Sequence, residues 1–246
     1  MCGRFIAVSS PQLLADHFSV EEIRVPEHEA CWNVAPRADV LVVVEDRRAE
    51  GSPRALEPMR WGLVPGWAKD RSIGDRLINA RAETVADKPA YERSFRLRRC
   101  LVPADGFYEW RAEREPGAGG RTRAMKQPVF IHDRSGEPLP LAGLWSSWRD
   151  PADPDAAWLH SCAIVTTRAN ELLAPLHDRM PVVLPEDVWD VWLDPAIEDT
   201  ALLEPLLVPA PETQLELWDV STRVNKADND GPDLVEPLPP RTLFDV

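Results

Sequence analysis

The second residue of the chain carries chemistry that no internal residue offers. The sequence opens Met1-Cys2-Gly3, and removal of an initiator Met before a small residue leaves Cys2 with a free α-amine beside its thiol. Such a 1,2-aminothiol takes an aldehyde into an imine and closes the imine into a five-membered thiazolidine. The thiol can also act as a nucleophile with the amine as its base. Reference pKa values are about 8 for the amine and about 8.5 for the thiol, so modest tuning would make both groups reactive near neutral pH. The ordinary alternative is a Cys in a frayed terminus.

Three internal side chains are candidates for moving or holding protons. Glu109 lies in an aromatic stretch over residues 107–110, where a carboxyl group can serve as an acid or base. His177 lies in a polar turn between apolar runs, and Asn79 alternates with small residues in a basic segment. Each has an ordinary alternative, since a Glu in a strand is often solvent-facing and a single His is often a structural hydrogen-bonding residue.

The charge distribution restricts nucleic-acid binding to one part of the chain. A net charge of −13 over 246 residues disfavours general affinity for nucleic acid. Residues 60–99 carry ten basic and five acidic side chains, which makes this segment +5. The segment predicts a basic groove on an acidic body, and the alternative is a solvated face of salt bridges.

The cysteines and the apolar runs predict a soluble cytoplasmic protein without a cofactor. Cys2, Cys31, Cys100 and Cys162 show no CxxC spacing, so we expect neither a zinc site nor another bound metal. Cys100 and Cys162 lie in apolar runs and are expected to be buried thiols. We find no signal-peptide pattern and no run of about 18 apolar residues.

The order of apolar runs and turns predicts one α+β domain around a curved, mostly antiparallel β-sheet or barrel with a few short helices. The 25 prolines favour short strands and turns. Strands are predicted at 39–45, 101–103 leading into 106–110, 128–132, 141–148, 160–167 and 215–220. Helices are predicted at 170–176 and 187–193, a long surface loop at 111–127, and a loosely held acidic tail at 225–246.

Seven motifs, in one order, resemble the SRAP family (SOS response-associated peptidase proteins). The resemblance runs from Cys2 to about Pro232 and implies an SRAP domain over 1–232 with an acidic, Pro-rich tail over 233–246. Two departures affect local packing: Cys31-Trp32 replaces a usual Tyr, and Lys226 replaces a common second Asn. The motifs are MCGRF at the start, WNVAPR at 32–37, RWGLVPGWAK at 60–69, INARAET at 78–84, RRCLVPADGFYEW at 98–110, AIVTTRAN…LHDRMPVVL at 163–184, and VSTRVNKADNDGP at 220–232.

The resemblance implies a protein that binds single-stranded DNA and captures abasic sites. The sugar aldehyde would form a covalent thiazolidine that shields the lesion in the DNA damage and SOS response. By motif position, Cys2 would be the nucleophile and Asn79, Glu109 and His177 its polar partners. Flanking phosphates and bases would be held by arginines and by stacking or wedging residues. These are Arg4, Arg81 and Arg179, and Pro36, Trp67 and Trp110.

The family name also implies removal of Met1 by the protein itself, in addition to lyase-like imine chemistry at abasic sites. An aminopeptidase could expose Cys2 equally well, and both routes remain open. The expected partner is abasic single-stranded DNA at replication forks, bound by a monomer that associates with the nucleoid at damage and has no contact with a membrane.

Two other classes of function are compatible with parts of the sequence. N-terminal-nucleophile glutamine amidotransferases also begin Met-Cys-Gly and form a glutamyl thioester, but the other segments typical of that class are missing, and glutamine hydrolysis would support it. A non-covalent single-strand binder would leave Cys2 incidental. Its DNA complex would vanish in denaturant, whereas a thiazolidine would persist.

Overall fold

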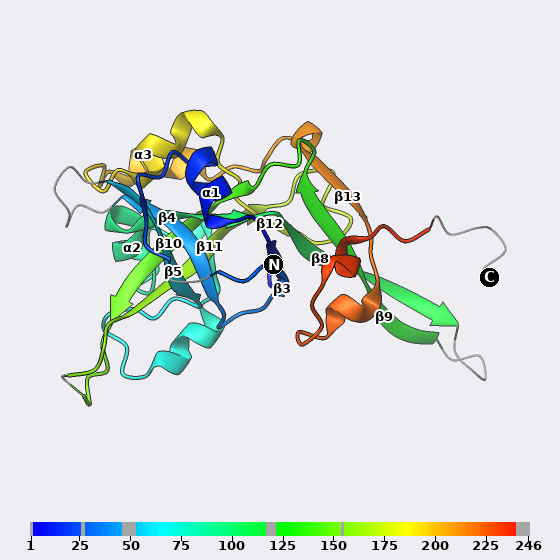
Figure 1. The fold of residues 1–246 in the computed structure, drawn as a ribbon, viewed down its shortest axis with the longest axis horizontal. Coiled ribbons are helices and arrows are strands. Elements are labelled where there is room, and N and C mark those ends of the chain that lie inside the picture. Colours follow the sequence, from blue (N-terminus) through cyan, green and yellow to red (C-terminus); the bar gives the residue numbers. More distant parts are fainter. Residues whose placement is uncertain (1, 26–27, 46–52, 117–121, 154, 240–246) are drawn as a thin grey trace.

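The computed structural model of the chain describes residues 2–25, 28–45, 53–116, 122–153 and 155–239 and shows two sheets that share one core (Figure 1). The larger sheet has the strand order β12-β11-β10-β7-β4-β5-β2, and the smaller has the order β13-β9-β8-β1-β3. Among the described residues, no helix is long and apolar enough to cross a membrane.

Five strands of the larger sheet close into a barrel. They are β4 (Asp39–Glu45), β5 (Arg54–Trp61), β7 (Arg99–Ala104), β10 (Leu139–Trp148) and β11 (Leu159–Arg168). Closure occurs because β11 pairs in parallel with β5, with Cys162 opposite Trp61. The short strands β2 (Glu22–Ile23), β6 (Asn79–Arg81) and β12 (Arg179–Pro181) add to its edges.

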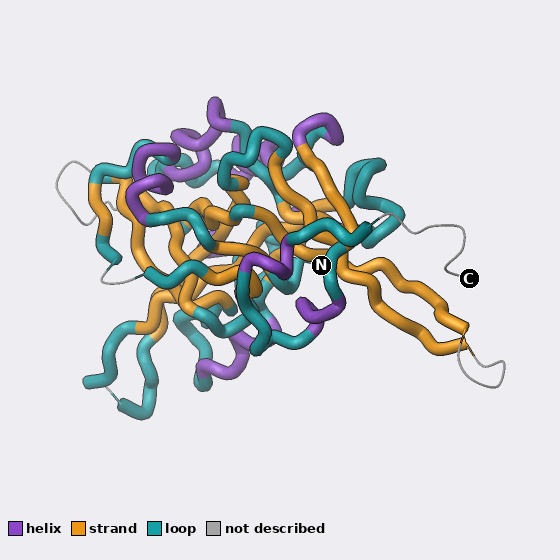
Figure 2. Tube along the Cα trace, turned by 45° about the vertical axis from the view of Figure 1, so that its right-hand side comes forward, coloured by secondary structure: helices purple, strands orange, loops and turns teal. Residues whose placement is uncertain are grey.

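The smaller sheet packs one face on the barrel. Its strands are β1 (Phe5–Ala7), β3 (Cys31–Val34), β8 (Gly106–Pro116), β9 (Thr122–Asp133) and β13 (Leu215–Asp219). Phe5 and Phe107 share an apolar cluster with the barrel residue Val42, whereas Ile6 and Tyr108 pack on the opposite face. Strands alternate their side chains between two faces, so this sheet is covered on both sides. Beyond the core, β8 and β9 continue as a two-stranded arm (Figures 1 and 2).

Short helices cover the outside of the barrel (Figure 1). Helix α1 begins with Ser10 as its N-cap, which accepts a hydrogen bond from Leu13 N–H at 3.2 Å. The α-helices are α1 (Pro11–His17), α2 (Glu92–Leu97), α3 (Trp189–Leu193) and α4 (Thr200–Leu203). The 3₁₀ helices are η1 (Arg71–Arg76), η2 (Ala82–Thr84), η4 (Glu186–Val188), η5 (Glu204–Leu206), η6 (Glu212–Gln214), η7 (Thr222–Asn225) and η8 (Pro232–Val235).

The α+β class and the predicted strands are confirmed. Each predicted strand overlaps β4, β7, β8, β9, β10, β11 or β13, and the helix predicted at 187–193 corresponds to η4 followed by α3. The helix predicted at 170–176 is wrong, because this segment forms turns. It makes a helical hydrogen bond from Ala174 N–H to Asn170 C=O at 2.9 Å, and Pro175 then has no N–H to continue the pattern.

Two segments expected to be irregular are ordered. The loop predicted at 111–127 is wrong, because β8 and β9 stay paired from Arg111↔Gln127 to Pro116↔Thr122; residues 117–121 lie outside the described part. The side chains of this segment are polar and show no apolar alternation, so the sequence did not predict strands. The two strands form because their backbone N–H and C=O groups hydrogen-bond to each other. The prediction of a loosely held tail is also wrong for residues 225–239, since Leu234 is fully buried under the smaller sheet. Residues 240–246 lie outside the described part of the chain.

One buried cation joins two helices to the barrel. Arg99, at the start of β7, is 2 % exposed, and its guanidinium donates to backbone carbonyls at the ends of α2 and α3. Carbonyls at helix C-termini have no partner within the helix, and a cation there also meets the negative end of the helix dipole. The four acceptors are Phe95 at 2.8 Å, Arg96 at 2.6 Å, Trp192 at 2.6 Å and Asp194 at 2.5 Å.

We therefore expect Arg99→Met to lower the free energy of unfolding by about 3 kcal/mol, because it leaves buried carbonyls without donors. The measurement is urea denaturation. The control is Arg96→Gln, which removes an exposed ion pair with Glu198 and should cost less than about 1 kcal/mol. Equal losses for the two variants would contradict this role of Arg99.

Candidate functional site

The pairing of β1 with β8 brings the N-terminus to the boundary between the barrel and the smaller sheet (Figure 1). Tyr108 N–H donates to Arg4 C=O at 3.0 Å, in register with the antiparallel ladder. Continuing this register brings the residues before Arg4 alongside Glu109. Cys2 is fully buried there, in the apolar cluster that fills the barrel. Met1 lies outside the described residues.

An amide from the barrel fixes the backbone of Cys2. Asn79 lies on β6, which pairs with β11, and its Nδ2 donates to Cys2 C=O at 2.7 Å. Its backbone carbonyl accepts a hydrogen bond from the Tyr91 hydroxyl at 2.9 Å. Asn79 Oδ1 is buried and has no hydrogen-bond partner among the described residues. Since buried polar atoms normally have a partner, this oxygen is an acceptor suited to an incoming donor.

Burial and a neighbouring carboxylate determine the state of the thiol. Burial raises the pKa of the Cys2 thiol, and the negative charge of Glu109 raises it further. Glu109 is itself only 2 % exposed. The sequence suggested that the pKa of this thiol is tuned toward neutral pH, whereas the structure shifts the pKa upward. In this state the thiol is protonated at neutral pH, and it needs a proton acceptor before it can attack.

His177 lies in the turn that follows β11. Leu173 and Met180, on either side of it in sequence, pack in the same apolar cluster as Cys2. Its Nδ1 accepts the N–H of Arg179 at 3.0 Å, and Asp178 Oδ1 lies 2.8 Å from the same nitrogen. Both contacts are made by Nδ1, and Nε2 takes part in neither of them. Nε2 is therefore the ring nitrogen that faces no partner in these two contacts and is available to a ligand.

The predicted DNA contacts fall into separate groups. Arg4 and Trp110 lie together, with the guanidinium carbon 6.0 Å from the ring centroid. The second group is Arg81 with Arg179. Both oxygens of Glu83 bind Arg179, at 2.8 and 2.9 Å, whereas Arg81 is exposed and forms no ion pair with the residues that the structure describes. The hydrogen bonds from Arg179 lower the pKa of Glu83, as expected for a charge-assisted pair.

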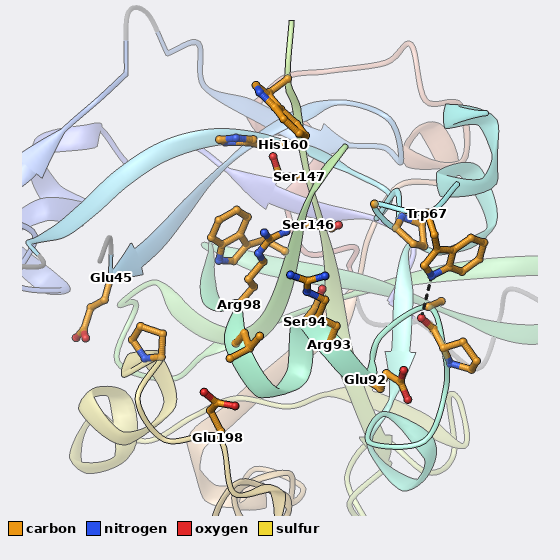
Figure 3. Close-up of a pocket in the computed structure, with 18 residues that line it drawn as sticks. Glu45, Trp67, Glu92, Arg93, Ser94, Arg98, Ser146, Ser147, His160 and Glu198 are labelled. Carbon is orange, nitrogen blue, oxygen red and sulfur yellow. Dashed lines mark hydrogen bonds between the residues drawn. The ribbon is translucent and has the colours of Figure 1, made fainter. Parts of the chain in front are cut away.

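The two remaining predicted contacts lie at a turn and at a groove. Pro36 is half-buried in the turn after β3. Trp67 is 61 % exposed and lines a groove of about 1040 Å³ whose wall also holds Arg93, Arg98 and His160 (Figure 3). The four predicted catalytic residues do not line this groove. Trp67 and the four predicted catalytic residues therefore do not share this groove.

Three of the basic residues in the segment 60–99 are bound to other groups of the protein. Arg60 pairs with Asp75 at 2.7 Å, and Arg96 pairs with Glu198 at 3.1 Å. Arg99 is buried on backbone carbonyls, as described above. Part of the positive charge in this segment is therefore used in ion pairs and at helix ends. A count of charged residues in the sequence does not distinguish such residues from exposed, unpaired cations.

Sequence reasoning missed Asn33, a nearly fully buried residue of β3. Its Nδ2 donates to the carbonyls of Val224 at 3.3 Å, Lys226 at 3.0 Å and Asn229 at 2.8 Å. Its Oδ1 accepts from Arg4 at 2.7 Å. Asn33 thus joins the N-terminal strand to residues 224–229 of the C-terminal segment. Two signals in the sequence pointed to it: its place in the WNVAPR motif and an Asn between Trp32 and Val34 in a short apolar run.

Comparisons with known proteins agree on one family. The model of the family described as SOS response associated peptidase (SRAP) matches residues 1–227. Abasic site processing protein YoqW of Bacillus subtilis is 38 % identical over 96 % of this chain and 99 % of that protein. Abasic site processing protein YedK of Escherichia coli is 31 % identical over 97 % of this chain and 100 % of its own. A solved structure from Bacteroides thetaiotaomicron, 21 % identical, has the same fold, with a TM-score of 0.81 over 96 % of this chain and 100 % of that one.

The geometry predicts that Glu109 suppresses the thiolate of Cys2. We expect Glu109→Gln to lower the pKa of the Cys2 thiol, so that alkylation by iodoacetamide becomes several-fold faster at a fixed pH below that pKa. Peptide mass spectrometry across a pH series reads each cysteine separately. Glu113→Gln, the same change on the same strand, is the control. Identical pH profiles for Cys2 in the wild type and in Glu109→Gln would contradict this arrangement.

Proposed function

Because the chain belongs to the SOS response-associated peptidase family, we propose that it binds single-stranded DNA and captures abasic sites covalently at Cys2. The observation that carries the proposal is the burial of Cys2 against Glu109 while Asn79 holds its carbonyl. The names of the relatives, abasic site processing proteins, point to the same substrate.

The proposed reaction begins at the closed sugar of the abasic nucleotide. Opening breaks the bond between the ring oxygen and C1′, places a proton on the ring oxygen and leaves an aldehyde at C1′. The α-amine of Cys2 adds to C1′ and gives a carbinolamine, which loses water to form an imine. The thiol sulfur then adds to the imine carbon, and its proton passes to the nitrogen. The product is a thiazolidine, and one water is released in all.

The neighbouring side chains have separate tasks in this scheme. His177, through Nε2, donates a proton to the ring oxygen as the sugar opens. Glu109 accepts a proton from the amine and returns one to the departing water. Asn79 Oδ1, the buried acceptor, receives a hydrogen bond from the amine while Nδ2 holds the Cys2 carbonyl. The protonated thiol loses its proton only as sulfur adds, which protects it from other electrophiles.

The flanking DNA would lie along residues of both groups described above. Arg4 and Trp110 would hold one side of the abasic nucleotide, and Arg81 would take a phosphate on the other. Arg179 would join Arg81 if a phosphate displaced Glu83. Pro36 and Trp67 would contact bases farther away. Capture in this way shields the lesion, and we place the monomer at single-stranded DNA of damaged replication forks.

Cys2 can form the thiazolidine only after Met1 is removed. Both self-processing and an aminopeptidase yield the same α-amine, and the proposed capture reaction is independent of the route.

The first test of this function removes the thiol. We expect Cys2→Ala to abolish the heat-stable adduct with an abasic oligonucleotide on a denaturing gel, because no sulfur remains to close the ring. Cys2→Ser should give only a labile adduct. Cys31→Ala is the matched control and should react as the wild type does. A stable adduct at normal yield with Cys2→Ala would refute capture through this residue.

The second test separates the two proton-transfer residues. His177→Ala should slow capture of the closed abasic sugar more than capture of an aldehyde that needs no ring opening. Glu109→Gln should slow both reactions, and also reversal of the adduct, because an amide cannot exchange these protons. General acid–base groups typically contribute about 10²–10⁴-fold in rate.

Single-turnover crosslinking with both aldehydes, and a competitor trap for reversal, provide these rates. Glu113→Gln serves as the control for loss of a carboxylate on β8. If Glu109→Gln leaves both capture rates at the wild-type value, Glu109 has a structural role only and the scheme is wrong.

A further inference from the structure

A small platform of backbone and side chains surrounds Trp110 at the base of the β8–β9 arm. Trp110 follows Glu109 on β8, so its side chain lies on the opposite face of the sheet. Its Nε1 donates to Asn225 Oδ1 at 2.6 Å, and Asn225 Nδ2 donates to Lys126 C=O at 3.4 Å. One asparagine of the C-terminal segment thereby connects the indole to the neighbouring strand of the arm.

Two exposed lysines are brought to this platform by different elements. Lys126 pairs with Ala112 on β8, two residues from the Trp110↔Pro128 pair, and therefore lies on the same sheet face as Trp110. Lys226 follows Asn225, and its carbonyl accepts from Asn33 Nδ2 at 3.0 Å. Neither lysine forms an ion pair among the described residues. Arg4, whose guanidinium lies over the Trp110 ring, is a third cation at this place.

The carboxylates of the neighbourhood are mostly engaged elsewhere. Asp219 binds Arg111 at 2.6 Å, and Asp230 accepts the backbone N–H of Trp32 at 2.7 Å. Asp233 pairs with Arg223, whereas Asp228 and Asp230 are exposed carboxylates without an ion pair among the described residues. Three cations (Lys126, Lys226 and Arg4) against these two carboxylates leave the platform with a small excess of positive charge on a chain of net charge −13. Exposed lysines without ion pairs, placed around an indole, are suited to bind a polyanion whose bases can stack on the ring.

We propose that Lys126 and Lys226 form, with Trp110, a binding surface for the sugar–phosphate backbone of the DNA strand next to the captured nucleotide. The lysines would contact successive phosphates while the indole stacks on a base. The inference rests on the proposed function, because Arg4, two residues after Cys2, places its guanidinium over the Trp110 ring and so connects this surface to the Cys2 site. It adds two phosphate contacts that lie outside that site and on separate elements.

The test measures equilibrium binding of labelled single-stranded oligothymidine, which has no abasic site, over a series of salt concentrations. For K126Q/K226Q we expect about tenfold weaker binding at low salt. The slope of log affinity against log salt should fall by about 0.7 for each lysine, or about 1.4 in all. The control is R134Q, which removes an exposed cation at the far end of β9, roughly 26 Å along the strand from Lys126. R134Q should keep the wild-type slope.

The outcomes separate this surface from the proposed capture reaction. A wild type that forms a stable abasic adduct, with equal salt slopes for wild type and K126Q/K226Q, would overturn the surface and leave the reaction standing. If the wild type forms no adduct, the proposed reaction is overturned. The salt dependence of oligothymidine binding still decides in that case whether the lysines bind phosphate. Equal binding of an acidic peptide, with the same dependence on the lysines, would also overturn a DNA surface. Matching thermal melts of the two variants would confirm that both are folded.

Discussion

The antiparallel pairing of β1 with β8 is the constraint on which the rest of the site depends. It fixes the register of the N-terminus against the strand that carries Glu109, and it does so inside the core, where Cys2 is fully buried. The hydrogen bond from Asn79 to the Cys2 carbonyl then ties this terminus to the barrel. A chain terminus is normally the most mobile part of a fold. Here, backbone pairing and burial convert it into a positioned reactive group.

The same burial has an electrostatic consequence. The thiol of Cys2 is placed in a poorly solvated environment next to a carboxylate, and both effects raise its pKa. In the proposed reaction, reactivity would therefore come from arrangement and local proton transfer rather than from a permanently ionised thiol. Asn33 extends this arrangement outward, since it binds Arg4 and three carbonyls of the C-terminal segment. The N-terminal strand and residues 224–229 consequently meet beside Asn33.

Much of the fold could be predicted from the sequence, because apolar runs such as 39–45 and 160–167 identify strands directly. The arm over 111–127 could not, since its side chains are polar and only backbone pairing reveals it. The candidate residues Cys2, Asn79 and Glu109 were found through their chemistry and their motifs. The fate of individual arginines was not predictable: Arg99 is buried and Arg179 is paired, which depends on tertiary neighbours rather than on local charge.

The most direct measurement of the central claim uses the protein that begins at Cys2 and two single-stranded oligonucleotides. One carries a natural abasic site, and the other carries a tetrahydrofuran analogue that cannot open to an aldehyde. After heating in denaturant, the account predicts a slow-migrating protein–DNA adduct with the natural site alone, at a mass equal to the two components less one water. No adduct with the natural site, or an equally stable adduct with the analogue, would contradict it.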